Sequence, residues 1–463
     1  MARRGEISRR KALRLAAQGV GATSVIAAGF PAIVSASVFG ATSPGNRINV
    51  GAIGTGRISR GHDLPGIWKH DQARIMAVCD LDSRRLEDAK TLVNGYYAKK
   101  TGQPYDGVTG YLDYKELFKN RDVDAVVIST PDHWHALITI QAVEAGKDVY
   151  LQKPASLTIA EGRAVSDAVH RTGRIFQIGS QQRSAAQFRY AAELVRNGRI
   201  GQLKTVYVGL PGDPSGEVEP EMPVPKGLNY EMWLGSTPWA YYTEKRVHPH
   251  EGYDRPGWLR CEQFGAGMIT GWGAHHIDSA HWGMGAEYTG PVEIKGTAEF
   301  PTKGLWDVHG PFRTEALYAD GVRMIVSGEF PNGIKFEGTE GWIFVSRGAE
   351  RVTASDPVAK LKDATALSAS DPKIITSTIG PTEIHLPVST DHHGNWLEAV
   401  RSRQQPIAPV EVAHRSCSAC LLHHIAMKTK RTLHWDPLRE RFKNDDEANA
   451  MLARPQRSPY GLA

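Results

Sequence analysis

Two residues in this 463-residue chain are well suited to moving a proton. Lys153 follows the short apolar stretch 148–151, and His275 lies in a segment rich in glycine and tryptophan. Hydride removal from a secondary alcohol needs a base for the hydroxyl proton and donors for the developing oxyanion. A lysine beside a positively charged nicotinamide ring holds its proton less tightly, and histidine titrates near neutral pH. Lys153 and His275 are therefore candidate catalytic residues, and the family resemblance given below implies that role, with Lys153 also touching the cofactor.

A glycine-rich turn between an apolar strand and a helix predicts a dinucleotide site. Residues 47–53 read as the strand, and Gly54 and Gly56 follow it. Glycines here allow a tight turn and let the backbone approach a pyrophosphate at the start of the next helix. We predict that both glycines contact the cofactor, together with Arg57 and Ile58.

An acidic residue at the end of the next strand indicates which dinucleotide binds. Asp80 follows the apolar stretch 73–79. A carboxylate there accepts hydrogen bonds from the adenosine ribose and repels a 2′-phosphate. NAD is therefore the predicted cofactor. Arg84 is a further candidate contact that leaves NADP open as an alternative.

The segment after a third predicted strand, 124–129, should also face the ligand. Ligands of doubly wound sheets lie beyond the carboxyl ends of the strands. Thr130, Pro131 and His135 are therefore predicted cofactor contacts. Trp134 either fills the core or contacts a sugar.

Several side chains are candidates for substrate contacts. Aromatic rings pack on the C–H faces of sugars, while amide and charged groups hydrogen-bond hydroxyls. Besides Trp134, the predicted substrate contacts are Gln181, Arg183, Tyr253, Trp258 and His276.

The order of strands and helices predicts an α/β protein of two domains. Strands alternate with helices over 46–183, which is typical of a doubly wound Rossmann sheet that is parallel. Over 184–440 strands follow one another, which predicts an α+β domain with an open, mostly antiparallel sheet. Residues 441–463 are a predicted tail, and the polar stretch 355–380 a predicted exposed insertion.

The first 41 residues read as an export signal. Ser8-Arg9-Arg10-Lys11-Ala12-Leu13 precedes a weakly apolar run and resembles a bacterial twin-arginine motif. Export to the periplasm is therefore predicted, without a stable membrane span after cleavage. Beyond this segment basic and acidic residues are equal in number, which argues against nucleic-acid binding.

A Cys-x-x-Cys pair is the one motif that suggests a metal. Cys417 and Cys420 lie in a predicted helix, 413–429, with no second such pair in the chain. Residues three apart share a helix face, so packing accounts for the spacing. We predict no metal site.

Taken together, four motifs resemble the Gfo/Idh/MocA oxidoreductases. They are Gly54–Ile58, Thr130-Pro131 with His135, Lys153-Pro154, and Gly273-Ala274-His275 with Asp278. The resemblance implies a Rossmann domain, a nicotinamide cofactor, a polyhydroxylated substrate, and a homo-oligomer formed through the open sheet.

The chain departs from the family pattern at two acidic positions. Gln152 stands where the family usually has Glu, and Gly271 where many sugar dehydrogenases have Asp. Three functions therefore stay open. The first is an NAD-dependent dehydrogenase of a sugar or glycoside. The second is an NAD-dependent glycosidase or lyase with a transient 3-keto sugar and a recycled cofactor. The third is a non-catalytic sugar-binding protein.

Overall fold

The structure, a computed structural model, describes residues 46–348 and 366–462. The predicted export segment and part of the predicted insertion lie outside these residues. Within the rest of that insertion, the chain forms the strand β13 (Leu367–Ala369) and the helix α11 (Pro372–Thr376) instead of patternless coil. No helix in the described part of the chain is long and apolar enough to cross a bilayer.

The first sheet is parallel, with the order β3-β2-β1-β4-β5-β6 across the described residues. Successive strands are added on one side of β1 up to β3, and then on its other side from β4 to β6. A crevice forms at the carboxyl ends of β1 and β4, where this order reverses. The strands are β1 (Ile48–Ile53), β2 (Ala73–Cys79), β3 (Thr109–Tyr111), β4 (Ala125–Ile128), β5 (Asp148–Leu151) and β6 (Phe176–Ile178).

Helices cover both faces of this sheet, because its central strands are apolar on both sides. Buried side chains of α2, α3 and α12 pack on one face, and those of α5 and α6 on the other. A helical turn, η2, leads from the glycine turn into α2. The elements are η2 (Ser59–Asp63), α2 (Leu64–Trp68), α3 (Ser83–Thr101), α4 (Tyr114–Lys119), α5 (Asp132–Glu144), α6 (Ile159–Thr172) and α12 (His392–Ser402).

The second sheet has the order β13-β12-β11-β7-β10-β9-β8-β14-β15, and β7 with β10 is its one parallel pair among the described strands. Along β9, buried positions alternate with more exposed ones, so one face is covered. The strands are β7 (Leu203–Gly209), β8 (Glu293–Ala298), β9 (Phe312–Leu317), β10 (Arg323–Ser327), β11 (Gly333–Gly338), β12 (Trp342–Val345), β14 (Leu433–Asp436) and β15 (Arg441–Phe442).

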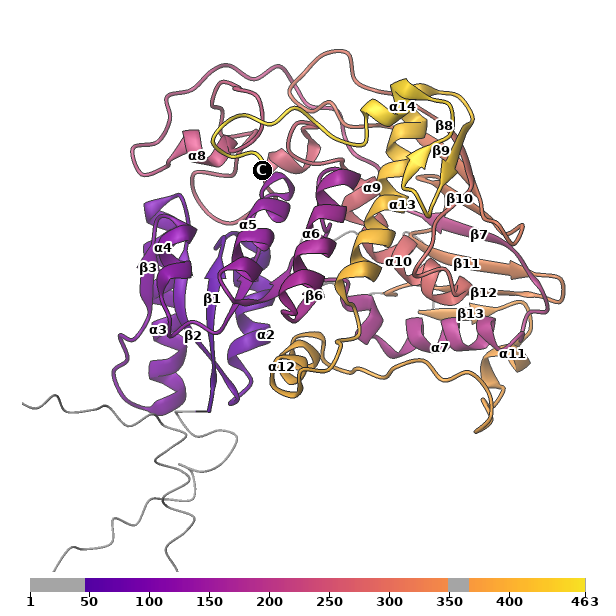
Figure 1. The fold of residues 1–463 in the computed structure, drawn as a ribbon, viewed down its shortest axis with the longest axis horizontal. Coiled ribbons are helices and arrows are strands. Elements are labelled where there is room, and N and C mark those ends of the chain that lie inside the picture. The colour runs from indigo at the N-terminus through magenta and orange to yellow at the C-terminus, as the bar shows by residue number, and fades with distance from the viewer. Residues whose placement is uncertain (1–45, 349–365, 463) are drawn as a thin grey trace, which may run out of the picture. The chain divides into compact units, whose positions relative to one another are not determined.

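The helices α7, α10 and α13 cover that face, and α13 lies between α6 and the second sheet (Figure 1). The predicted fold class, a Rossmann sheet followed by a mostly antiparallel one, is confirmed. The remaining helices are η3 (Gln181–Ser184), α7 (Ala186–Arg196), α8 (Tyr230–Leu234), η4 (Gly257–Arg260), α9 (Met268–Gly271), α10 (Gly273–Met284), α13 (Val410–Thr429) and α14 (Asp446–Ala450).

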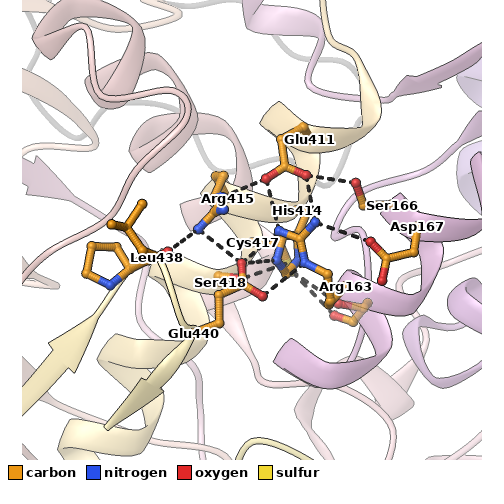
Figure 2. Close-up of polar contacts among 12 residues, drawn as sticks. Arg163, Ser166, Asp167, Glu411, His414, Arg415, Cys417, Ser418, Leu438 and Glu440 are labelled. Carbon is orange, nitrogen blue, oxygen red and sulfur yellow. Dashed lines mark hydrogen bonds and ion pairs between the residues drawn. The ribbon is translucent and has the colours of Figure 1, made fainter. Parts of the chain in front are cut away.

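An ion-pair network fastens α13 to α6 (Figure 2). The Arg163 guanidinium of α6 donates two hydrogen bonds to Glu411 and two to Glu440, at 2.8–3.0 Å. Arg415 donates to Glu411, and the His414 ring is 2.7 Å from Glu440. Partial burial alone raises the pKa of both carboxyls. These bonds outweigh it, lowering the pKa of Glu411 to about 2 and that of Glu440 well below its usual range.

The network predicts an acid-dependent loss of stability. A carboxyl whose pKa is lower in the folded protein stabilises fully above its unfolded pKa, about 4.3. That contribution disappears as the pH falls through this value toward 2. Between pH 6 and pH 3 the unfolding temperature of Arg163→Gln should therefore drop less than that of the wild type. Arg171→Gln, which removes an exposed pair with Glu144, is the control and should behave like the wild type. Equal drops in all three proteins would contradict the assignment.

Candidate active site

A cleft of about 1600 Å³, counting its open mouth, lies at the carboxyl ends of the Rossmann strands. Side chains of the second domain form its other wall. Of the predicted residues, the cleft is lined by Gly54, Gly56, Arg57, Ile58, Asp80, Thr130, Pro131, Trp134, Lys153, Gln181, Trp258 and His275. Sequence motifs far apart in the chain therefore meet in one cavity.

The glycine turn has the shape that a dinucleotide needs. Gly54 has φ +81°, and a Cβ added there would lie 2.8 Å from the backbone carbonyl of Ser129. A Cβ at Gly56 would meet no atom within 4 Å, so space remains open above the backbone. Thr55 donates two hydrogen bonds to Asp80, from its backbone N and its hydroxyl, at 2.8 and 2.9 Å. Asp80 thus fixes the turn and also lines the cleft, and this end fits a dinucleotide.

Lys153 and His275 lie in the same cleft. The Lys153 ammonium donates a hydrogen bond to the backbone carbonyl of Gly271, four residues before His275, at 3.0 Å. Burial, with the charges of Arg347 and Lys153, holds the pKa of His275 well below its usual value. Within the described residues its Nδ1 has no hydrogen-bond partner. At pH 7 His275 is therefore a neutral imidazole that can orient a substrate hydroxyl.

His135 does not line the cleft but ties together two loops that do. Its ring nitrogens lie 2.6 Å from the carbonyl oxygen of Pro154 and 2.9 Å from that of Thr130. Burial lowers the pKa of His135 to about 4, so the ring is neutral and donates to one carbonyl at a time. His135 thereby holds the loop after β5 against the first turn of α5.

A buried carboxylate, Asp63 of η2, supports both loops from behind. It accepts hydrogen bonds from the Ser129 hydroxyl at 2.7 Å and from the Gln152 amide at 2.8 Å. The rings of His62 and His393 lie 2.9 and 3.1 Å away. Burial by itself raises the pKa of Asp63, but the histidine bonds outweigh it and the net pKa is low. Asp63 is therefore ionised, and an amide at position 152 avoids a second carboxylate beside it.

Residues 248–256, here called the covering segment, fasten the second domain to the start of α3. Arg85 donates to the backbone carbonyls of Pro249 and Gly252, at 2.9 and 3.3 Å. The Tyr253 hydroxyl donates to Asp88 at 2.9 Å. The guanidinium groups of Arg60 and Arg85 lie 4.2 and 4.6 Å from the centre of the Tyr253 ring.

The covering segment also forms part of the cleft wall near the glycine turn. His248 also reaches across the domains and lies 3.3 Å from Asp82. The covering segment contributes His248, Asp254, Arg255 and Pro256 to the same cleft as Gly56 and Asp80. Tyr253 itself does not line the cleft; it anchors the segment that does.

Three other predicted residues are not among those that line the cleft. Arg183 makes a two-bond ion pair with the buried carboxylate of Asp278, at 2.7 and 2.9 Å, and also pairs with Glu287. His276 is buried, with Nδ1 2.9 Å from the Gly209 carbonyl. Arg84 is exposed, and its neighbour Arg85 lines the cleft instead.

The predicted site residues do not include five charged residues of the cleft: Arg85, Asp132, Asp254, Arg255 and Arg347. The position of Asp132 after β4 predicts the location of its loop but gives no sign of its deep burial. Arg347 follows β12, and its guanidinium lies 4.6 Å from the centre of the Trp272 ring. Its place near His275 depends on tertiary packing, so no local sequence signal could have located it.

The Cys-x-x-Cys pair lies on a packed helix. Cys417 and Cys420 are buried free thiols of α13, and the Cys417 thiol donates to the Ser156 carbonyl at 3.5 Å. Among the described residues, His62, Asp63 and His393 bring three metal-ligand atoms within 4.8 Å of one another. Hydrogen bonds already occupy the Asp63 carboxylate in that cluster.

Comparison with known families agrees with this geometry. Residues 48–180 match the oxidoreductase family model for an NAD-binding Rossmann fold, and residues 214–371 and 375–462 match the family's C-terminal alpha/beta domain. The chain therefore belongs to the Gfo/Idh/MocA oxidoreductase family, and NAD is the cofactor of its Rossmann domain.

The individual relatives match this chain either over a short stretch or at low sequence identity. A "Glycosyl hydrolase family 109 protein" of Shewanella pealeana is 31% identical over 168 residues, which is 36% of each chain. The match thus spans about a third of that relative's length. The WlbA dehydrogenase of Bordetella pertussis, crystallised with NADH and UDP-GlcNAcA, has a TM-score of 0.58 and 15% identity over 84% of this chain and 99% of its own. Levoglucosan dehydrogenase, in complex with NADH and levoglucosan, has a TM-score of 0.56 and 18% identity over 84% of this chain and 99% of its own.

The placement of Arg183 predicts a structural effect without a binding effect. Arg183→Met leaves Asp278 buried without its partner, which should lower the free energy of unfolding by about 3–5 kcal/mol. NAD affinity, measured by titration, should stay within twofold because Arg183 does not line the cleft. Arg196→Met is the control, since Arg196 pairs with the same Glu287 from a more exposed position. A stable Arg183→Met protein would contradict the structural role.

Proposed function

We propose that this protein is an NAD-dependent oxidoreductase that removes hydride from a secondary hydroxyl of a sugar or glycoside. The observation that carries the proposal is the cleft itself. It joins a dinucleotide turn, with Gly56 and Asp80, to a lysine and a neutral buried histidine, Lys153 and His275. Family membership supports the same class of reaction.

In this proposal the protein side chains handle the proton. Lys153, in its amine form, accepts the proton of the substrate hydroxyl. NAD held at the turn of Gly54 and Gly56 would supply the acceptor for the hydride of the carbinol carbon. His275 hydrogen-bonds the same oxygen and stabilises the charge that develops on it. The hydrogen bond from Lys153 to the Gly271 carbonyl brings the two groups together.

The rest of the lining suits a sugar ring. Trp134, Trp258 and Trp272 offer aromatic faces, and Gln181 offers an amide. Two structural neighbours, WlbA and levoglucosan dehydrogenase, were crystallised with sugar compounds. We therefore place the substrate among sugars and glycosides, without naming the carbon that is oxidised.

A second candidate function is a glycosidase or lyase that recycles its NAD. Transient oxidation at C3 makes the C2 proton acidic, elimination breaks the glycosidic bond, and the hydride then returns to the sugar. The covering segment supports this candidate because it favours a retained cofactor. The family 109 relative supports it over the matched third of its length. A retained cofactor also suits the proposed export, since free NAD is scarce outside the cytoplasm.

Product analysis tests the proposed function. Purified protein with its bound NAD is given a panel of glucosides and galactosides, with products resolved by NMR and the cofactor followed by absorbance. We expect a keto-sugar in step with reduced cofactor. Lys153→Ala should lose at least 100-fold in turnover yet bind NAD normally. Free sugar and aglycone without net reduction would favour the glycosidase instead, and turnover by Lys153→Ala would contradict both.

Cofactor retention tests the role of the covering segment. Tyr253→Ala removes the hydrogen bond to Asp88 and both arginine–ring contacts, and a charge-assisted bond contributes about 1.5–3 kcal/mol. The NADH dissociation rate, measured by stopped-flow fluorescence, should therefore rise about tenfold or more. Tyr241→Ala is the control, because Tyr241 contacts Glu219 and Arg246 rather than α3. An unchanged rate in Tyr253→Ala would show that the segment does not retain the cofactor.

A further inference from the structure

Asp132 is a cleft carboxylate that the proposed reaction does not yet use. It is the first residue of α5, and only 4% of its surface is exposed. Its loop follows β4, and the Lys153 loop follows the neighbouring strand β5. The hydrogen bond from His135 to the Pro154 carbonyl draws these loops together.

Lys153 is the charged group that acts on this carboxylate. Burial raises the pKa of Asp132 to about 7, although the positive charge of Lys153 lowers it. A buried carboxylate is stable as an ion only beside a cation or strong donors. Asp132 can therefore change between charged and neutral forms near neutral pH, and it lines the same cleft as Lys153.

The other titratable groups around this pair keep one charge state at pH 7. Burial lowers the pKa of His135 to about 4 and that of His275 further, so both rings are neutral. On α13, burial raises the pKa of the Cys417 thiol to about 11. Arg347 remains a cation beside His275. Among these groups, Asp132 is the one whose pKa lies near neutral pH.

Position 271 offers Lys153 no carboxylate. Gly271 supplies its backbone carbonyl to the Lys153 ammonium, and a Cβ there would lie 3.3 Å from the Met268 methyl group. A carboxylate that lines the same cleft stands on α5, that of Asp132.

We propose that Asp132 is the proton-relay partner of Lys153, an inference that rests on the proposed oxidoreductase function. The substrate loses a hydride to NAD and its hydroxyl proton to the Lys153 amine. The resulting ammonium passes that proton through water in the cleft to the Asp132 carboxylate, and Asp132 releases it by the same route to the open mouth of the cleft. Each turnover thus gives one ketone, one reduced cofactor and one proton, and leaves Lys153 ready for the next substrate.

The pairing is testable without any sugar. NAD-bound protein is acetylated with trace acetic anhydride across a pH series, and Lys153 labelling is read by peptide mass spectrometry. A neighbouring carboxylate favours the ammonium form by about 1–3 pH units. The midpoint for Lys153 should therefore move down by at least one unit in Asp132→Asn and in Asp132→Ala, and return in Asp132→Glu.

Asp213→Asn is the matched control for labelling. Asp213 is also buried and accepts a hydrogen bond from the Met268 backbone, but its charged neighbours are Arg255 and Arg260. Its replacement should leave the Lys153 midpoint unchanged. A Lys153 midpoint that stays at the wild-type pH in Asp132 variants that still bind NAD would overturn the relay, whatever the turnover.

A pH profile of kcat/KM then separates a relay from mere support. In the wild type the rate should fall as the pH drops through about 7, because protonated Asp132 cannot accept a proton. Asp132→Asn should lose the limb near pH 7, keep only the lower limb set by Lys153 itself, and run about 100-fold slower on its plateau. A lower rate with an unchanged limb would overturn the relay. Absence of sugar turnover in the wild type would count against the oxidoreductase proposal, and the labelling result would still decide the pairing.

Discussion

The buried charge of Asp63 constrains the catalytic end of the cleft. A carboxylate in a protein interior is costly unless donors surround it, and Asp63 accepts hydrogen bonds from Ser129 and Gln152. Ser129 directly precedes the Thr130-Pro131 turn, and Gln152 directly precedes Lys153. Satisfying one buried charge therefore fixes the first residues of both loops. The π-helical geometry of η2 brings Asp63 beneath the strand ends, where a regular helix would direct that position differently.

The two departures from the family pattern acquire one physical explanation. With Asp63 ionised beneath position 152, a second carboxylate there would be repelled, whereas the Gln152 amide donates to Asp63 at 2.8 Å. At position 271 the backbone carbonyl of glycine receives the Lys153 ammonium, and a carboxylate stands across the cleft on Asp132. Negative charge is thus present around Lys153, but other residues carry it. The loss of the family's Glu at position 152 and of its Asp at position 271 is therefore weak evidence against catalysis in this chain.

The sequence located the site well where one rule of parallel sheets applied. Carboxyl ends of parallel strands meet at one edge, so the amino-acid sequence alone sufficed to place Gly54, Asp80, Thr130 and Lys153 in one cleft. The same rule does not say which charged side chains form ion pairs with one another. Arg183 and a true substrate ligand look alike in sequence, because the partner of Arg183, Asp278, is 95 residues away. Asp63 was equally hidden, since its donors come from three distant segments.

The two ends of the cleft are held by interactions of different strength. At the catalytic end the Asp63 cluster is buried, so salt screens it little and the loops keep their positions. At the glycine turn the covering segment is held by Tyr253, whose partner Asp88 is exposed, and by His248, whose partner Asp82 is buried. Salt therefore screens the exposed Tyr253–Asp88 contact more than it screens the Asp63 cluster. In the proposed function, the strength of this fastening bears on whether a reduced cofactor is released at each turnover or kept for many.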